Sequence, residues 1–259
     1  MENAYDRIGV GYSKHRCADP RLVDALTRAL ALAPPAVLAD IGAGTGNYSR
    51  AMADRGFHIE AVEPSPVMRK QAVTHPLVAW RRGTAEAIPL GDDSVDGVFC
   101  ILASHHFGDL ESGVSEMARI CRAGPIVWFT LDPRREELPW LRNYFPELHE
   151  QGLKVFRPLE EVCHLLEARA KRQITAIPWP VPNDLQDCFW AAGWRRPEMY
   201  LDPEIRASIS LFALADPAAL ADGLSMLERD LADGTWRAKY GAILQRQAID
   251  WGYRLLIAS

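Results

Sequence analysis

Cysteine is scarce in this 259-residue sequence, and its placement excludes several kinds of protein. The five cysteines are scattered, with no Cys-x-x-Cys pair and no Cys/His cluster at zinc-binding spacing. Cys163 and His164 are adjacent, so on a helix they would point in different directions, which suits a metal site poorly. We therefore expect neither a disulfide framework nor a structural metal.

Long apolar runs and a strong charge imbalance are also missing. No run approaches the roughly 20 apolar residues of a membrane helix, and residues 1–7 lack a signal-peptide pattern, so we expect a cytoplasmic protein without a membrane partner. The net charge of −5 argues against the broad cationic surface of a nucleic-acid-binding protein. We interpret Arg134-Arg135 and Arg195-Arg196 as solvated loop charges, with a local anion site as the alternative.

Glycine is concentrated at one informative place, residues 40–46, which read Asp-Ile-Gly-Ala-Gly-Thr-Gly. The apolar run 36–39 before it is typical of a buried parallel strand, and a helix can begin at residue 47. Glycines let the backbone turn sharply and approach a ligand closely. A dinucleotide site favours G-x-G-x-x-G, whereas these glycines alternate as G-x-G-x-G. A structural turn and a dinucleotide site remain alternatives for these seven residues.

An acidic residue follows the next expected strand. Residues 56–62 predict that strand, and Glu63 ends it. A carboxylate at this position can accept hydrogen bonds from both hydroxyls of a ribose, and dinucleotide-binding domains place an acid at similar spacing. Glu63 therefore indicates an adenosine-type ligand without choosing between ligand classes. Residues 65–73 predict a helix with Pro66 in its first turn.

A third signal begins at Gly83-Thr84-Ala85-Glu86 and continues to an apolar strand at residues 95–102. This run resembles the "G-x-A-E-x-L-P-F-x-D-x-S-F-D" stretch of the class I S-adenosylmethionine-dependent methyltransferases typified by the ubiquinone and menaquinone biosynthesis enzymes. Residues 40–46 resemble motif I of the same family, and the likeness covers residues 5–131. It implies an α/β, Rossmann-like, seven-stranded, mostly parallel sheet with helices on both faces. It also implies S-adenosyl-L-methionine as cofactor and S-adenosyl-L-homocysteine as product.

The resemblance also implies which residues bind the cofactor. In that family the loop with the Ala-Glu pair lies against the adenine, the next strand ends beside the transferred methyl, and N-terminal aromatic and basic residues cover the methionine end. The corresponding positions here are Tyr12, Arg16, Asp40, Gly42, Gly44, Gly46, Glu63, Pro64, Met68, Thr84, Ala85, Glu86, Leu102 and Ala103. For Tyr12 and Arg16 a plain surface position is the alternative.

Catalytic and substrate-binding candidates come from the segments after the fourth strand. His105 and His106 follow that strand, where an imidazole can remove a proton from a phenol or a carboxylic acid, or orient it. The alternative is that these histidines cap a loop or pack in the core. A thiol or an amine needs no such base, because positioning alone can be enough for its methylation. Four aromatic residues are candidates for a substrate pocket, with core packing as the alternative: Trp140, Tyr144, Trp194 and Tyr200.

We expect one methyltransferase domain over residues 1–259. It would comprise a cofactor-covering segment (1–33), a cofactor-binding core (34–131) and a C-terminal half (132–259). Further strands are predicted at 77–81, 124–131, 172–177 and 252–258, and helices at 20–32, 110–120, 158–170, 184–192, 204–215 and 217–231. About 70 residues separate the last two strands, which is too long for an ordinary loop. We interpret them as a substrate cap, mainly residues 183–250.

The main hypothesis is methyl transfer from S-adenosylmethionine to a small molecule, with the accepting atom open among O, N, S and C. Quinone-type C-methylation is one named possibility, although the long aromatic C-terminal half departs from the compact quinone enzymes. One alternative is a catalytically silent module that retains the cofactor for binding or regulation. Another is a nicotinamide oxidoreductase, which the glycine spacing disfavours.

Overall fold

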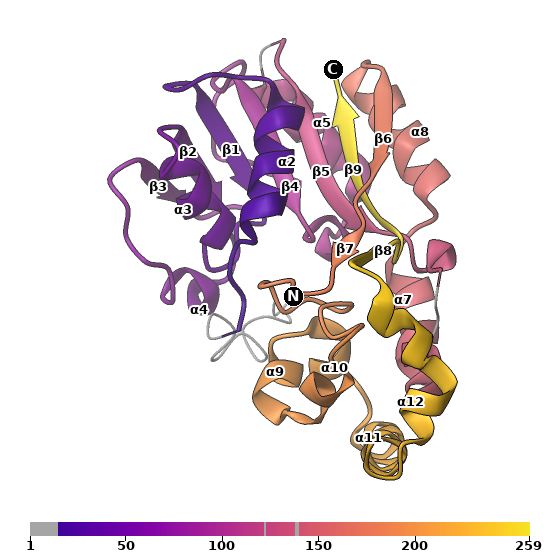
Figure 1. Ribbon diagram of the computed structural model, residues 1–259. Helices are drawn as coiled ribbons and strands as arrows, with labels where there is room; N and C mark the ends of the chain where they lie inside the picture. The colour runs from indigo at the N-terminus through magenta and orange to yellow at the C-terminus, as the bar shows by residue number, and fades with distance from the viewer. Residues whose placement is uncertain (1–14, 122, 138–139) are drawn as a thin grey trace.

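A seven-stranded sheet forms the centre of the computed structural model, which describes residues 15–121, 123–137 and 140–259 (Figure 1). The strand order is β3-β2-β1-β4-β5-β9-β6. The strands are β1 (Val37–Ile41), β2 (His58–Val62), β3 (Val78–Arg81), β4 (Gly97–Ile101), β5 (Ile126–Leu131), β6 (Ile174–Pro178) and β9 (Tyr253–Ala258). Only β9 runs against its neighbours. The predicted Rossmann-like, mostly parallel fold is confirmed.

The strand order reverses beside β1, which pairs with β2 on one side and with β4 on the other. Parallel strands bring their carboxyl ends to one edge of the sheet, and ligands of such sheets bind in the crevice at this switch point. The glycine turn at residues 42–46 begins directly after β1 at that edge. The topology therefore determines where the ligand site must be sought.

Helices cover both faces of the sheet because side chains of successive strand residues point to opposite faces. On one face Leu38 and Phe99 pack with α2 (Pro20–Leu30) and α3 (Asn47–Ala53). On the other face Ile41 and Trp128 pack with α5 (Leu110–Ile120) and α8 (Leu159–Ala170). A short helix, α4 (Pro66–Arg69), follows β2. None of the helices in the described ranges combines the length and apolarity needed to cross a bilayer.

A second layer of short helices lies beyond the carboxyl ends of the parallel strands (Figure 1). We call it the cap, and it comprises residues 133–137, 140–157 and 179–252. Its helices are α6 (Trp140–Tyr144), α7 (Pro146–Val155), α9 (Pro203–Ala207), α10 (Ser210–Ala213), α11 (Pro217–Ala232) and α12 (Thr235–Tyr240), and a ribbon of β7 (Val181–Pro182) and β8 (Ala248–Ile249) joins it to the sheet. Cap and sheet share one continuous apolar core.

The cap differs from the expectation in several elements. Residues 184–192 were expected as a helix but form turns and bends. Backbone amides of Gln186 and Cys188 donate to Asp19 and to the carbonyl of His15, in the segment before α2, instead of forming a helical ladder. The expected helix 204–215 is divided into α9 and α10 at Ser208 and Ile209. The cap also contains α6 and α7, which precede α8 in the sequence and lie outside the expected cap at residues 183–250. Tertiary contacts outweigh helical periodicity here.

Candidate functional site

A cavity of about 560 Å³ opens at the carboxyl ends of β1, β2 and β4. Its walls come from the glycine turn, the end of β2, the loop at residues 83–86 and the end of β4. Eleven of the residues expected to bind the cofactor line it: Arg16, Gly42, Gly44, Glu63, Pro64, Met68, Thr84, Ala85, Glu86, Leu102 and Ala103. Segments far apart in the sequence therefore form one ligand-sized hollow.

Two of the expected cofactor-binding residues, Asp40 and Gly46, lie outside the cavity wall. Asp40 is buried beneath the turn and accepts a hydrogen bond from Ser49 Oγ at 2.6 Å, and burial raises the pKa of its carboxyl to about 7. Gly46 begins α3 at φ +78°, where a Cβ would lie 2.6 Å from the Trp80 ring. Both residues shape the turn without lining the cavity. Tyr12 lies outside the described residues.

The first glycine of the turn lets two loops approach each other. Gly42 has φ +75°, and a Cβ there would lie 2.4 Å from the Cβ of Ala103, at the end of β4. A side chain would therefore push the two loops apart, in addition to being strained at this backbone angle.

Glu63 is held at the edge of the cavity by two backbone amides. Gly44 N donates to its Oε2 at 2.9 Å, and Ser65 N donates to its Oε1 at 2.8 Å. The side chain is buried and lines the cavity. These two bonds fix the direction of the Glu63 carboxylate, so the carboxylate is oriented before any ligand binds.

Glu86 acts on the neighbouring loop. Its Oε1 accepts hydrogen bonds from Gly108 N at 2.6 Å and Asp109 N at 3.2 Å. Phe107 and Gly108 then form part of the cavity wall near Ala85. Ala85 and the aromatic ring of Phe107 make this part of the lining apolar.

Several lining residues were missed by the sequence analysis, and Asp187 is the most distant. This buried cap residue accepts hydrogen bonds from Arg16 and, at 3.0 Å, from the hydroxyl of Tyr48. Asn47 also lines the cavity and donates to the carbonyl of Arg16 at 2.7 Å. Asn47 and Tyr48 follow the glycine turn, so their position alone could have indicated them. No sequence signal marks Asp187.

A second cavity, of about 40 Å³, lies between the strand ends and the cap. It shares Arg16 and Leu102 with the first cavity, and Leu102 has an unusual φ of +49°. The remaining lining is mostly apolar: His105, Leu131, Phe156, Phe189, Trp190, Ile209, Ser210, Leu211 and Tyr253. A small apolar chamber thus adjoins the larger cavity where β4 ends.

The two candidate catalytic histidines face different cavities. His106 lines the larger cavity and His105 the smaller one. Burial, followed by the charges of His106 and Arg16, lowers the pKa of His105 well below its ordinary value, and burial lowers the pKa of His106 to about 4. The His105 ring lies against Phe156, with centroids 4.3 Å apart, and its Nδ1 has no hydrogen-bond partner in the described parts of the chain. Both imidazoles are therefore neutral near pH 7.

The four aromatic residues expected at a substrate pocket pack inside the cap instead. Trp140, Tyr144, Trp194 and Tyr200 are all buried, and none lines either cavity. Their polar atoms bond within the protein: Trp140 Nε1 donates to the carbonyl of Trp194 at 3.0 Å, and Tyr144 donates to Asp230 at 2.9 Å. The cap residues that reach the small cavity are Phe156, Phe189, Trp190, Ile209, Ser210 and Leu211.

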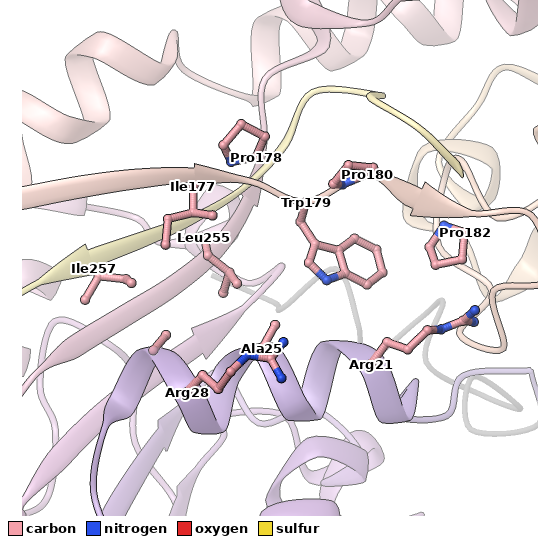
Figure 2. Close-up of a pocket in the computed structure, with 11 residues that line it drawn as sticks. Arg21, Ala25, Arg28, Ile177, Pro178, Trp179, Pro180, Pro182, Leu255 and Ile257 are labelled. Atoms are coloured by element: carbon pink, nitrogen blue, oxygen red, sulfur yellow. The ribbon is translucent and has the colours of Figure 1, made fainter. Parts of the chain in front are cut away.

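A third hollow, of about 430 Å³, lies on the outside of the molecule between α2 and the β6–β9 edge (Figure 2). Arg21, Ala25 and Arg28 line it from the helix, and Ile177 and Trp179 from the opposite wall. It shares no lining residue with the other two cavities. The third hollow contains none of the predicted site residues, whereas the other two cavities contain most of them. We therefore place the candidate site at the carboxyl ends of the strands.

Comparisons with known proteins identify the family of this chain. A family model described as a methyltransferase domain matches residues 39–129. The malonyl-[acyl-carrier protein] O-methyltransferase of Salmonella typhimurium is 31% identical over 181 residues, which cover 67% of this chain and 70% of that protein. The chain belongs to the class I S-adenosylmethionine-dependent methyltransferases.

Two further relatives show how far the likeness of this methyltransferase extends. A crystal structure described as a methyltransferase from an antibiotic biosynthesis pathway of Anabaena variabilis is 51% identical, with a TM-score of 0.92, and the match covers 95% of this chain and 99% of that one. An uncharacterised methyltransferase of Mycobacterium tuberculosis is 36% identical over 105 residues, or 40% of this chain. That match spans 43% of the mycobacterial protein's length.

Proposed function

We propose that this methyltransferase transfers the methyl group of S-adenosylmethionine to a hydroxyl of a small, largely apolar molecule bound beneath the cap. The observation that carries the proposal is His105, a neutral imidazole in an apolar chamber beside the larger cavity, whose Nδ1 has no hydrogen-bond partner among the described residues.

The larger cavity has the features that an adenosine-bearing cofactor requires. The fixed carboxylate of Glu63 can accept from ribose hydroxyls, and the apolar lining by Ala85 and Phe107 suits an adenine ring. S-adenosylmethionine, when bound, supplies a methyl carbon made electrophilic by a sulfonium. Leu102 lines both cavities and lies at their junction, so this is where we place the reacting atoms.

His105 suits a hydroxyl better than other accepting groups. A hydroxyl both donates and accepts a hydrogen bond, so it can pair with Nδ1 in either tautomer of the imidazole. When Nδ1 is unprotonated, it can take the hydroxyl proton as the oxygen–carbon bond forms and the carbon–sulfur bond breaks. The cap meanwhile keeps water from the site, which protects the reaction from competing hydrolysis.

The charges of the chamber disfavour an anionic acceptor. Arg16 is the one charged side chain among the residues described as lining it, and its guanidinium is already paired with Asp187. An acceptor carboxylate would lose its hydration and add a net negative charge to a pair that already balances itself. This favours an uncharged organic molecule, as suits a relative from an antibiotic pathway, over the malonyl-[acyl-carrier protein] named for the Salmonella relative.

The test has two stages. Calorimetric titration with S-adenosylhomocysteine should show binding, and the absence of binding would reject the proposal. Methyl-labelled cofactor should then label phenols and apolar alcohols, and should not label carboxylic acids of matched shape. Binding without labelling of any acceptor would favour a silent cofactor-binding module, and binding of reduced nicotinamide cofactor instead would favour an oxidoreductase.

A further inference from the structure

One segment of the cap lies directly against the segment that precedes and begins α2. We call residues 184–190 the strap. Cys188 N donates to the carbonyl of His15 at 3.2 Å, and Gln186 N donates to Asp19 Oδ2 at 3.1 Å. Asp184 and Asp187 form ion pairs with arginines of the same opposing segment. Hydrogen bonds and ion pairs therefore attach the strap to the opposing segment at several positions.

Asp187 lines the larger cavity, which we call the cofactor cavity, as one partner of an ion pair with Arg16. Asp187 is 1% exposed, and Arg16 and Tyr48, two described residues that donate to its carboxylate, line the same cavity. Burying an ion pair costs desolvation free energy that the pair itself need not recover. An anion and a cation placed together on a cavity wall do, however, match a ligand end that carries both charges.

The cofactor of the proposed function has such an end, an amino acid with an ammonium and a carboxylate on one carbon. We propose that Asp187 binds this ammonium while Arg16 binds the carboxylate, so that the cap itself recognises the cofactor. The inference rests on the proposed function. It assigns a binding role to a residue that lies outside the residues matched by the family model.

The same contact couples the two cavities. Phe189 and Trp190 follow Asp187 on the strap and line the small cavity, whereas Asp187 lines the large one. A cofactor bound to Asp187 therefore also fixes Phe189 and Trp190, which are two walls of the small cavity that we call the acceptor chamber. This predicts that the amino-acid end of the cofactor, and not its nucleoside, orders the acceptor site.

Asp187→Asn tests the contact because it keeps the size of the side chain and removes its charge. We expect calorimetry to show a 10- to 100-fold weaker affinity for S-adenosylhomocysteine. The affinity for 5′-methylthioadenosine, which lacks the amino-acid end, should change less than twofold. Glu63→Gln should weaken the binding of both ligands, because Glu63 faces the nucleoside.

Asp184→Asn is the matched control. Asp184 also joins the strap to the opposing segment, through Arg21, but its side chain is 72% exposed and does not line the cavity. It should leave both affinities unchanged. Equal weakening of both ligands by Asp187→Asn would show a merely structural role, and unchanged affinities would show no contact; either result overturns the inference.

Hydrogen exchange provides a second readout on the wild-type protein. S-adenosylhomocysteine should slow amide exchange over residues 184–192, and 5′-methylthioadenosine at saturation should not. Equal protection by both ligands would contradict the coupling. If the wild-type protein binds S-adenosylhomocysteine as expected but Asp187→Asn has no effect, only this inference fails; if the wild-type protein does not bind it, the proposed function fails.

Discussion

The two ends of the site are built in different ways. The cofactor cavity is formed by short loops at strand ends. Its wall includes Gly42 and Gly44 of the turn and the carboxylate of Glu63, which backbone amides hold in place. The acceptor chamber is formed where the cap meets the sheet, by apolar and aromatic side chains from widely separated segments. Recognition by local backbone can be carried by a short motif, whereas recognition by packed side chains depends on the whole cap.

The aromatic core holds the cap in a defined shape. Trp140 lies edge-on to Tyr200 and Trp236, with ring centroids 5.8 and 5.5 Å apart, and such pairs add to the stabilisation from buried area. Trp194 Nε1 donates to the carbonyls of Val181 and Pro182, each at 3.1 Å, and so attaches this core to the β7–β8 ribbon. Aromatic residues that were expected at a substrate pocket therefore support the cap residues that line the small cavity.

The largest effect should come from removing part of this support. Trp194→Ala should lower the free energy of unfolding by about 3–5 kcal/mol, because it leaves a cavity and unpaired carbonyls. Urea unfolding followed by circular dichroism measures the change. Tyr144→Phe, which removes only the hydrogen bond to Asp230, should cost about 1 kcal/mol. Similar losses for both variants would contradict the role given to Trp194.

The next effect concerns chemistry beneath the cap. His105→Phe preserves an aromatic ring against Phe156 and should lower kcat for a hydroxyl acceptor by about 100-fold or more. Affinity for S-adenosylhomocysteine should change little, since His105 does not line the cofactor cavity. His164→Gln, in α8, serves as the control. Unchanged turnover in His105→Phe would show that the imidazole takes no part in the reaction.

On the cofactor side, Glu63→Ala should weaken binding of S-adenosylhomocysteine by about 1.5–3 kcal/mol through loss of charge-assisted bonds to the ribose. Glu60→Gln is a suitable control, because Glu60 lies on the same strand and pairs with Arg81 at the surface. Calorimetry distinguishes the two variants. Equal affinity in Glu63→Ala and wild type would rule out the ribose contact.

The smallest effect is expected from pH. Because burial lowers the pKa of both histidines, to about 4 for His106, kcat/KM should change less than about twofold between pH 6 and 8. A histidine with the ordinary pKa of about 6.5 would give a rise of about fourfold. The same lowered pKa values affect stability. Below about pH 6.5 the histidines take up protons in the unfolded state but not in the folded state. The free energy of unfolding should therefore fall as the pH falls.

The sequence predicted the strands of the sheet to within a few residues, together with most of the residues that line the cofactor cavity. The strands and the position of these residues on the cavity wall could be predicted because the turn after β1, Glu63 and the Ala85-Glu86 loop are local signals at topologically defined strand ends. Their role in cofactor binding stays a prediction. Residues 184–192 show the opposite case. Their helical pattern was overridden by hydrogen bonds to a segment about 170 positions earlier, such as Gln186 N to Asp19.

By itself, the sequence determined the fold class, the family and the edge of the sheet at which the cofactor cavity forms, because each depends on short motifs and on the regular period of strands and helices. Only the tertiary structure decided which aromatic residues build the cap and which line the acceptor chamber. It alone brought Asp187 to Arg16. Side-chain packing between distant segments leaves no period in the sequence, so these positions follow from the three-dimensional arrangement.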